Sequence, residues 1–403
     1  MRHIVIIGAG QAGQEAAAAL RSGGFDGHLT LVGDEAHLPY QRPPLSKAYL
    51  HAEMAEADLY LETANSLGAK TIRFIGNDRA TGIDRQARRV LLASGTALTY
   101  DHLILATGAR ARPLPGSIAN VASLRSLHDA NGLRQSLGGA RRALVIGAGF
   151  IGLEFAATAS AMGIAVDIVE REDQIMARVS SQPVARAVQR HHEAKGVRFH
   201  LGRGVASFDG AWGVELDDGT RLNGDIVLAA IGVQPNSELA AECGLACSNG
   251  IVVDSMLLTQ DPAISAIGDC ASFAMPGWER PVRLESVQNA ADHGVYVAGR
   301  ILGSKVPYSQ LPLFWTDQAG LRLQIAGLAR PDDETMLRGD PDGAFSVFHL
   351  RAGRLVCVES VNRPADHMGA RALLKAGVTP SLAQIADIGT NLREIAAAAT
   401  VPA

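Results

Sequence analysis

One short glycine pattern occurs twice in this chain, and both copies have the same surroundings. The first copy is GAGQAG at residues 8–13, and the second is GAGFIG at residues 147–152. Each follows a short apolar run, at residues 2–7 and 142–146, and precedes a stretch rich in helix formers. A strand, a glycine turn and a helix in this order are typical of a βαβ unit that binds a dinucleotide. The chain is therefore expected to build two such units.

The three glycines of each pattern have separate tasks. Gly8 permits the tight turn, Gly10 lets the backbone approach a pyrophosphate, and Gly13 lets the helix pack on the strand. The helix N-terminus adds partial positive charge. The same tasks fall in the second copy to Gly147, Gly149 and Gly152.

An acidic residue follows each pattern by about 20 residues, where it can accept a hydrogen bond from a ribose hydroxyl. In the first unit this residue is Asp34, and in the second it is Glu170. Because a carboxylate repels a 2′-phosphate, Glu170 predicts NADH rather than NADPH at the second unit. Two patterns imply two dinucleotides, or one dinucleotide and one relic. A pair that exchanges electrons, a flavin and a nicotinamide, fits best.

The composition limits the class of protein. A length of 403 residues suggests two or three domains, and 47% hydrophobic with 19% charged residues describes a soluble globular chain. The net charge of −4 gives no global field for nucleic acid. No run of about 18 apolar residues occurs, so no membrane span is expected. Four cysteines without C-x-x-C spacing favour a reducing compartment, the cytoplasm, and buried thiols; no metal site is expected.

Three further stretches carry a family resemblance. LILATG at 103–108, TQDPAISAIGDC at 259–270 and YQRPPLSK at 40–47 resemble motifs of the two-dinucleotide-binding flavoprotein disulfide reductase superfamily. The resemblance implies that the first glycine pattern binds FAD, that the second binds NAD(P)H, and that the stretch ending at Asp269 closes on the flavin ribityl chain. Residues 35–60 contain no cysteine, so the dithiol relay of that superfamily is absent.

The motifs RPPLSK, GDC, RLESVQNA and FWTDQ together resemble the single-chain ferredoxin and rubredoxin reductases of the putidaredoxin-reductase type. The resemblance implies an NADH-dependent enzyme that passes electrons through FAD to a [2Fe-2S] ferredoxin or a rubredoxin serving an oxygenase. Two alternatives stay open. One is an NADH oxidase or peroxide reductase of the same superfamily, and the other is a non-catalytic flavoprotein whose NADH-dependent shape regulates a partner.

The same resemblance implies roles for individual residues. The residues expected to contact FAD are Gly8, Gly10, Ala12, Gly13, Asp34, Arg42, Lys47, Ala80, Arg125, Asp269 and Val287. Those expected to contact NADH are Gly147, Gly149, Ile151, Gly152, Glu170, Arg178 and Gly232. Four side chains are expected to position and tune the reacting rings without acting as nucleophiles: Lys47, Glu154, Glu285 and Trp315.

The expected fold is α/β and glutathione-reductase-like, with two Rossmann-like domains and a C-terminal α+β domain. An FAD domain is expected to be split between residues 1–109 and 233–310, with an NADH domain at 110–232 and an interface domain at 311–403. Within residues 351–375, five basic residues stand against Glu359 and Asp366, which predicts local attraction for an acidic carrier. Arg371 and Arg393 are the residues expected to dock it.

Overall fold

The computed structural model describes residues 3–116, 121–210 and 212–400, and the chain forms two compact units. The first unit consists of residues 1–42, 55–110 and 233–310, and the second of residues 43–54, 111–232 and 311–403. The segment 43–54, which contains Lys47, therefore packs with the second unit. The division into an FAD domain, an NADH domain and an interface domain stays a prediction.

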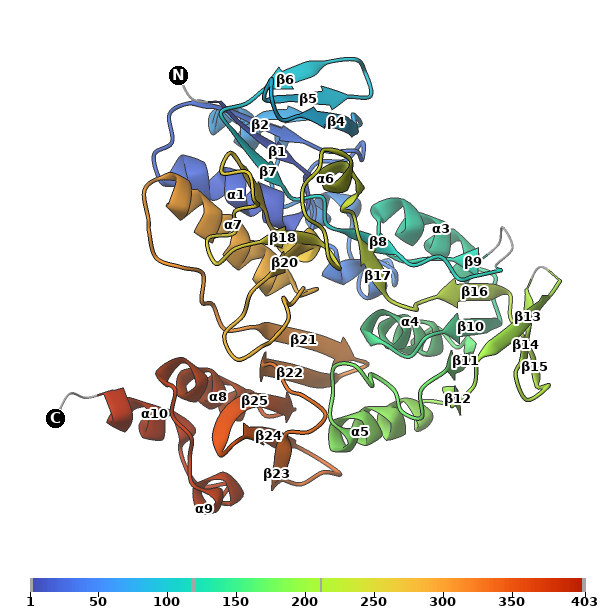
Figure 1. The fold of residues 1–403 in the computed structure, drawn as a ribbon. Helices are drawn as coiled ribbons and strands as arrows, with labels where there is room; N and C mark the ends of the chain where they lie inside the picture. The colour runs from blue at the N-terminus through green and yellow to red at the C-terminus, as the bar shows by residue number, and fades with distance from the viewer. Residues whose placement is uncertain (1–2, 117–120, 211, 401–403) are drawn as a thin grey trace. The chain divides into compact units, whose positions relative to one another are not determined.

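The first unit contains a five-stranded parallel sheet whose central strand, β1 (His3–Ile7), precedes the first glycine loop. The order of its strands is β19 (Ile264–Ala266), β7 (His102–Leu105), β1, β2 (His28–Val32) and β3 (Arg73–Ile75). Helices α1 (Gln11–Ser22) and α7 (Val287–Ile301) pack side by side against each other (Figure 1). Strands β1, β2, β7 and β19 are short, mostly apolar and largely buried, as expected for a parallel sheet, whereas the edge strand β3 is partly exposed.

A second five-stranded parallel sheet in the second unit repeats this plan. Its central strand, β10 (Arg142–Ile146), precedes the second glycine loop, and α4 (Phe150–Ala161) follows that loop. The order of its strands is β12 (Arg198–Leu201), β11 (Ala165–Glu170), β10, β16 (Ile226–Ala229) and β9 (Val121–Ala122). The last residue of each central strand pairs with its neighbour in the same way, Ile7 with Val32 and Ile146 with Val169. The two predicted βαβ units are thus present.

Smaller elements complete the two units. The first unit has an antiparallel sheet of β4 (Ala80–Asp84), β5 (Arg89–Leu92) and β6 (Ala97–Thr99), a pair of β18 (Ile251–Val253) and β20 (Ala271–Phe273), and the helices α2 (Ala64–Ala69) and α6 (Glu238–Glu242). The second unit adds α3 (Leu127–Leu137), α5 (Gln182–Glu193) and a sheet of β13 (Val205–Asp209), β14 (Gly213–Leu216) and β15 (Arg221–Asn223). Strands β8 (Ala109–Ala111) and β17 (Val233–Pro235) form a two-stranded sheet.

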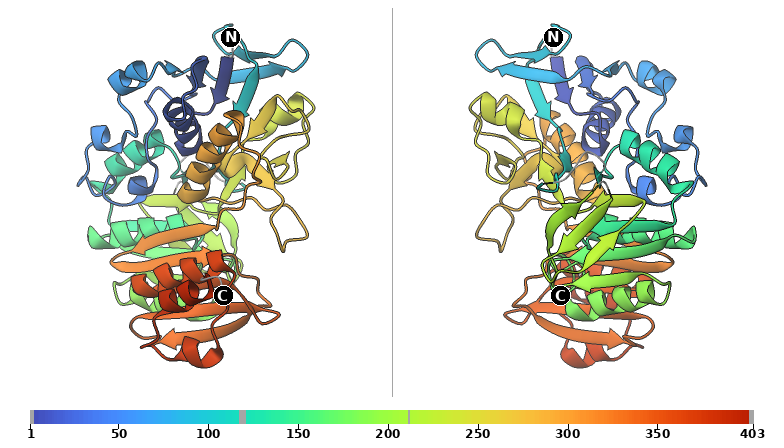
Figure 2. Two further views of the ribbon diagram at one scale, coloured as in Figure 1. Left: turned by 90° about the vertical axis from the view of Figure 1, so that its left-hand side faces the viewer. Right: turned by 90° about the vertical axis from the view of Figure 1, so that its right-hand side faces the viewer.

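The C-terminal part of the second unit is an antiparallel sheet covered by helices. The order of its strands is β21 (Leu313–Gln318), β22 (Leu321–Gly327), β25 (Arg354–Val361), β24 (Phe345–Arg351) and β23 (Glu334–Gly339). Helix α8 (Pro364–Ala376) packs on β25 and β22 and lies beside α10 (Leu392–Thr400), with the short α9 (Leu382–Ala386) near β23 (Figure 2). The expected hairpin around residues 351–354 is present as β24 and β25, and the predicted fold class is confirmed.

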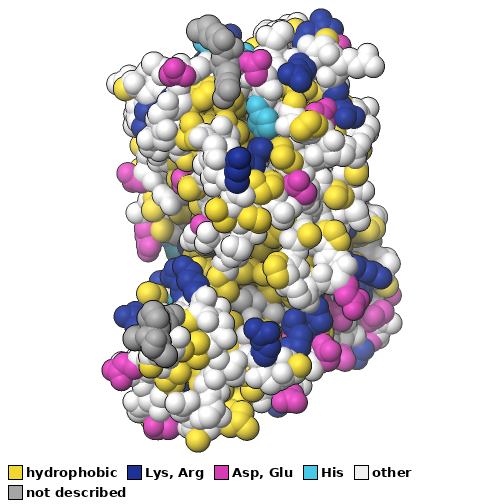
Figure 3. Space-filling view, turned by 60° about the vertical axis from the view of Figure 1, so that its left-hand side comes forward, with side chains coloured by type: hydrophobic (Ala, Val, Ile, Leu, Met, Phe, Trp, Pro, Cys, Tyr) yellow, Lys and Arg dark blue, Asp and Glu magenta, His cyan; other side chains and the backbone are white. Residues whose placement is uncertain are grey.

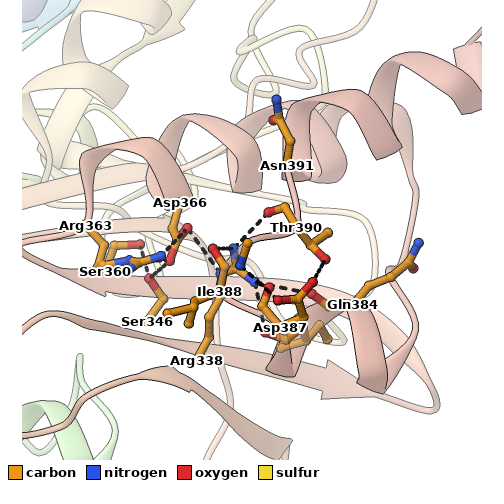
Figure 4. A network of polar contacts seen from close by, with 12 residues as sticks. Arg338, Ser346, Ser360, Arg363, Asp366, Gln384, Asp387, Ile388, Thr390 and Asn391 are labelled. Carbon is orange, nitrogen blue, oxygen red and sulfur yellow. Dashed lines mark hydrogen bonds and ion pairs between the residues drawn. The ribbon is translucent and has the colours of Figure 1, made fainter.

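A buried arginine holds the end of the chain to this sheet. Arg338 on β23 is 2% exposed, and its guanidinium donates to the backbone oxygens of Ile388 at 3.1 Å and Thr390 at 2.9 Å (Figure 4). It also donates to the backbone oxygens of Gln384, Ile385 and Asp387, and its Nε lies 3.2 Å from Asp366 Oδ1. One side chain therefore bonds the backbone of the segment from α9 to α10 at several points.

None of the helices in the described parts of the chain combines the length and the apolar character that a membrane crossing requires.

Candidate functional site

The first glycine loop has the shape that a dinucleotide needs. Gly8 has a φ of +112°, and a Cβ there would lie 2.0 Å from the backbone oxygen of Ala106. A Cβ on Gly13 would lie 1.9 Å from the backbone oxygen of Gly8. At Gly10, by contrast, no described atom lies within 4 Å of the Cβ position. Two glycines are thus required by close packing, and the third leaves open space beside the helix N-terminus.

The second glycine loop repeats this geometry. Gly147 has a φ of +104°, and a Cβ there would lie 2.5 Å from the backbone oxygen of Ala230. A Cβ on Gly152 would lie 2.2 Å from the backbone oxygen of Gly147, whereas the described residues leave open space at Gly149. Both helices start at a glycine cap, which has no side chain to accept from the first N–H groups of α1 and α4, so these groups can donate to an anion. Both loops fit a pyrophosphate.

The acids after β2 have different surroundings. Asp34 is exposed, as a group that accepts from a ribose hydroxyl must be. Its neighbour Glu35 accepts from Arg42 Nη2 at 2.8 Å and from the Tyr40 hydroxyl at 2.7 Å, and the Arg42 guanidinium lies 5.0 Å from the Tyr40 ring centroid. Glu35 was not predicted as the partner of Arg42. The role of Arg42 toward FAD stays a prediction.

The loop that carries Asp269 lies against the first glycine loop. A Cβ on Gly268 would lie 2.9 Å from Ala12 Cβ, and the Gly268 N–H donates to His293 Nδ1 at 3.1 Å. His293 belongs to α7, whose first residue is Val287. The structure thus brings the Asp269 loop and the helix that begins at Val287 close to Ala12, beside the first glycine loop (residues 8–13, the first cradle).

Two other residues of the first unit, Ala80 and Glu285, were also predicted to lie at the site. Ala80 begins β4, two residues after Asp78, whose N–H donates to the backbone oxygen of Gly33 at 3.1 Å. Glu285 accepts from Arg283 Nη2 at 2.6 Å, and Arg283 Nη1 donates to the backbone oxygen of Asp269 at 3.1 Å. Glu285 therefore reaches the Asp269 loop through Arg283.

Glu170 is fixed at the entrance of the second glycine loop. Its carboxylate accepts from the Ala148 N–H at 2.7 Å and from the Glu172 N–H at 3.0 Å. The Met176 N–H donates to the backbone oxygen of Ala148 at 2.9 Å, so the segment after Glu170 is also tied to the glycine loop.

Three further residues predicted to contact NADH, Ile151, Arg178 and Gly232, also lie in the second unit. Arg178 is exposed, and its Nη2 lies 3.6 Å from the Cβ position of Gly232, which has a φ of +93°. Ile151, in the first turn of α4, is exposed. Arg125, which was predicted to contact FAD, is half-buried just before α3, and its N–H donates to Asp129 Oδ2 at 2.9 Å. Its role toward FAD stays a prediction.

Lys47 and Glu154 form an ion pair inside the second unit. Lys47 Nζ lies 2.6 Å from Glu154 Oε2, and the Ser46 hydroxyl donates to the same oxygen at 2.5 Å. The Thr316 hydroxyl donates to Glu154 Oε1 at 2.6 Å. Glu154 is 5% exposed, and Trp315, next to Thr316, is 42% exposed. Two predicted positioning residues therefore meet directly, whereas the flavin contacts of Lys47 and Trp315 stay predictions.

Ser46 and Thr316 were not predicted as site residues. Each is adjacent to a predicted residue, Lys47 and Trp315, so the motifs RPPLSK and FWTDQ contained the signal. What the motifs could not supply is that both hydroxyls point to one carboxylate on α4.

The four cysteines are free. Cys270 and Cys357 are buried, as expected, and burial raises the pKa of both thiols. The expectation of buried thiols is wrong for the other two. Cys243, at the end of α6, is only half-buried, and Cys247, in the loop that follows, is exposed. Among the described residues, no group of three or more His, Cys, Asp or Glu side chains is arranged to hold a metal ion.

Comparison with known proteins gives matches over nearly the whole chain. The family model for the pyridine nucleotide-disulphide oxidoreductases matches residues 2–294, and the model for the reductase C-terminal domain matches residues 313–396. Rhodocoxin reductase from Rhodococcus erythropolis is 46% identical, over 97% of this chain and 93% of that protein.

Two crystal structures are similar throughout. The ferredoxin reductase for the CYP199A2 system from Rhodopseudomonas palustris has a TM-score of 0.95 and 44% identity, covering 98% of this chain and 100% of that chain. The reductase in the covalent putidaredoxin reductase–putidaredoxin complex has a TM-score of 0.95 and 38% identity, covering 100% of this chain and 99% of that chain.

Proposed function

Because the chain belongs to the pyridine nucleotide-disulphide oxidoreductase family, we propose that it is an NADH-dependent, FAD-containing reductase of a small iron–sulfur protein. The electron acceptor is a [2Fe-2S] ferredoxin or a rubredoxin that serves an oxygenase. Similarity over the full length to ferredoxin reductases, one of them solved in complex with putidaredoxin, supports this acceptor class.

One observation carries the proposal: the chain has two complete dinucleotide cradles and no cysteine in residues 35–60. FAD, when bound, supplies a ring that accepts a hydride from NADH and gives up electrons singly. Without a dithiol in that segment, the electrons have no disulfide to reduce and are suited to a one-electron carrier. The first cradle, with Asp34 and the Asp269 loop, is assigned to FAD, and the second to NADH.

The side chains of the second unit would bind and orient rather than react. Glu170, held by the Ala148 N–H, would accept from the 2′-hydroxyl of NADH and repel a 2′-phosphate. Arg178 and Gly232 lie together where the rest of the nucleotide would pass. Lys47 and Glu154 would hold the nicotinamide and flavin rings in register, because hydride transfer depends on close and correct alignment.

Docking of an acidic carrier would use a local basic surface. Lys and Arg side chains form several groups among acidic side chains on the face shown in Figure 3. Arg351 Nε lies 2.7 Å from Asp333 Oδ1, and Arg363 Nε lies 2.8 Å from Asp366 Oδ2. Two of the five predicted cations therefore form ion pairs within the second unit.

Arg371 and Lys375 lie one helical turn apart on α8, with Arg371 half-buried and Lys375 exposed, and Arg393 is exposed on α10. Helices α8 and α10 contact each other, which puts these cations on neighbouring elements. We assign transient docking to them, with Arg371 and Arg393 as the principal contacts.

A panel assay tests the proposed function. Purified FAD-loaded protein is mixed with NADH and, separately, with several [2Fe-2S] ferredoxins, rubredoxins, cytochrome c and oxygen. Rapid turnover only with a ferredoxin or rubredoxin is the expected result. Turnover with oxygen or peroxide alone would indicate an oxidase or peroxide reductase, and a stable reduced complex without turnover would indicate a regulatory flavoprotein.

The proposed location is the cytoplasm. Four free cysteines are typical of a reducing compartment, where NADH is also available.

A further inference from the structure

A chain of buried hydrogen bonds leads from Glu154 to a histidine on another helix. We infer that Thr316, supported by Gln318 and His192, is a positioning residue that fixes the Glu154 carboxylate and, through it, Lys47. The inference rests on the proposed function, because it assigns its consequence to the NADH half of the reaction.

This buried network contains three hydrogen bonds in addition to the Lys47–Glu154 ion pair. The Thr316 hydroxyl lies 2.6 Å from Glu154 Oε1, Gln318 Nε2 lies 2.8 Å from the Thr316 hydroxyl, and His192 Nε2 lies 3.0 Å from Gln318 Oε1. Thr316 is 1% exposed, and Gln318 and His192 are fully buried. These residues come from β21 and α5, and Glu154 comes from α4, so the chain joins three elements of the second unit.

The donors of this chain all point the same way. Glu154 as a carboxylate can only accept, so the Thr316 hydroxyl donates to it, and Gln318 Nε2 then donates to the Thr316 oxygen. Gln318 Oε1 is left to accept, which requires the proton of His192 on Nε2. Burial lowers the pKa of His192 to about 4, so the ring is neutral near pH 7 and can carry that single proton. Aligned bonds of this kind strengthen one another in a low-dielectric interior.

The arrangement divides the Glu154 carboxylate between two sets of donors. Thr316 takes Oε1, and Ser46 and Lys47 take Oε2. Without the Thr316 hydroxyl, Oε1 would be buried without a donor, and the carboxylate would gain by turning toward Lys47 or drawing it inward. Simple core packing would be served by valine at position 316, which has the same shape. Burying a hydroxyl and an amide is costly unless both are hydrogen-bonded, and both Thr316 and Gln318 are bonded here. Among the described residues His192 Nδ1 has no partner, so the network ends at His192.

The test compares Thr316→Val with Thr316→Ser in the FAD-loaded protein. Two quantities are measured: the Kd of a non-reducible NADH analogue by calorimetry, and the rate of flavin reduction by NADH in a stopped-flow instrument. Loss of a hydrogen bond to a charged group predicts about a tenfold loss in reduction rate for Thr316→Val. Thr316→Ser, which keeps the hydroxyl, should stay within about twofold of the parent protein. A weaker analogue Kd in Thr316→Val that Thr316→Ser restores would support the inference independently of turnover.

Two further variants separate positioning from folding. Thr30→Val removes another buried strand hydroxyl, which bonds His3 at 2.9 Å in the first unit, and should leave both quantities unchanged. If Thr316→Val does not fold, Gln318→Met removes the next link and should shift both quantities in the same direction. An unchanged reduction rate and analogue Kd in the folded Thr316 or Gln318 variant would overturn the inference.

A double-mutant cycle with Glu154→Gln completes the test. If Thr316 acts through Glu154, Thr316→Val should add little to Glu154→Gln. Full additivity of the two single-variant effects would overturn the inference. A Glu154→Gln variant with the reduction rate and analogue Kd of the parent would also overturn it. Neither outcome would contradict the reduction of a ferredoxin. If instead no ferredoxin or rubredoxin is reduced but the cycle shows coupling, the proposed function fails and the positioning role stands.

Discussion

The carboxylate of Glu170 is predicted to determine the preference for NADH over NADPH. Its position is set by two backbone N–H groups, those of Ala148 and Glu172, so its charge is presented at the entrance of the second glycine loop. Glu170→Ala removes the repulsion against a 2′-phosphate and the acceptor for the 2′-hydroxyl. We expect the ratio of kcat/KM for NADH over NADPH to fall about tenfold or more, which corresponds to ~1.4 kcal/mol. Steady-state assays with both nucleotides measure it.

Glu170→Gln is the matched control for that change. The amide keeps an oxygen that can accept from the Ala148 N–H but has no charge, so it separates repulsion from loop geometry. The glutamine variant should show a smaller fall in the ratio, because its amide can still bond the 2′-hydroxyl. A parent protein that prefers NADPH would refute the role of Glu170 altogether.

The four thiols are predicted to be unnecessary for turnover. Burial raises the pKa of all four, so the thiolate form that would react is disfavoured. A variant with all four cysteines replaced by alanine or serine should keep its NADH-to-ferredoxin rate per bound flavin within about twofold, because no thiol is oxidised or reduced. A collapse of that rate with FAD still bound would contradict the prediction.

At the scale of elements, Arg338 fastens α9 and the segment before α10 to the C-terminal sheet (Figure 4). Arg338→Met should destabilise the protein by about 2–3 kcal/mol, because it leaves several backbone oxygens without this donor, while Asp366 keeps its ion pair with Arg363. Thermal unfolding and limited proteolysis within residues 384–391 measure the effect. Arg338→Lys keeps the charge but not the planar fork, so it should recover only part of the stability. Equal stability of the parent and Arg338→Met would show that the network contributes nothing.

Helices α8 and α10 carry the charges assigned to carrier docking. Arg371→Glu and Arg393→Glu should raise the KM for ferredoxin several-fold and flatten its salt dependence, because local charge mainly accelerates association and salt screens it over about 8 Å. Flavin reduction by NADH should not change, since it uses other residues. As a control, Arg354→Glu reverses an exposed charge on β25 instead. This control should leave the ferredoxin KM unchanged. If Arg371→Glu and Arg393→Glu also leave that KM and its salt dependence unchanged, the carrier docks elsewhere.

The elements that sequence could predict are those whose cause is local. The two glycine loops, their strands and helices, and the β24–β25 hairpin follow from periodicity and from glycine geometry over a few residues. The pair Lys47–Glu154 and the link from Glu154 to Thr316 join residues far apart in the chain, so no local pattern could place them together. Charge counting over residues 351–375 failed for Arg351 for the same reason, because its partner Asp333 lies outside that stretch and is brought to it by the fold.

At the scale of the whole molecule, several histidines are buried as neutral rings. Burial lowers the pKa of His192 and of His367 to about 4, and that of His293 to about 3. Between pH 6.5 and 4 these rings bind protons in the unfolded chain but not in the folded one. The contribution of these neutral rings to the free energy of unfolding is therefore fully present above pH 6.5 and is lost as the pH drops toward 4. Burial raises the pKa of Asp167 and Asp333, but Arg198 and Arg351 lower it more, so these carboxyls add their own loss only at still lower pH, below about 4.

His367 offers the cleanest test of this acid sensitivity. It is buried on α8, and after burial the positive charges of Arg371 and Arg322 lower its pKa further. His367→Phe replaces the ring by one that cannot bind a proton, so the urea-unfolding midpoint should fall less between pH 7.5 and 4.5 than in the parent protein. Expressed as free energy of unfolding, the parent should lose on the order of 2 kcal/mol more than His367→Phe between these pH values. At pH 7.5 the pH-dependent difference should be small, because both rings are neutral. Parallel pH profiles for the two proteins would mean that His367 is not the buried neutral group that its surroundings imply.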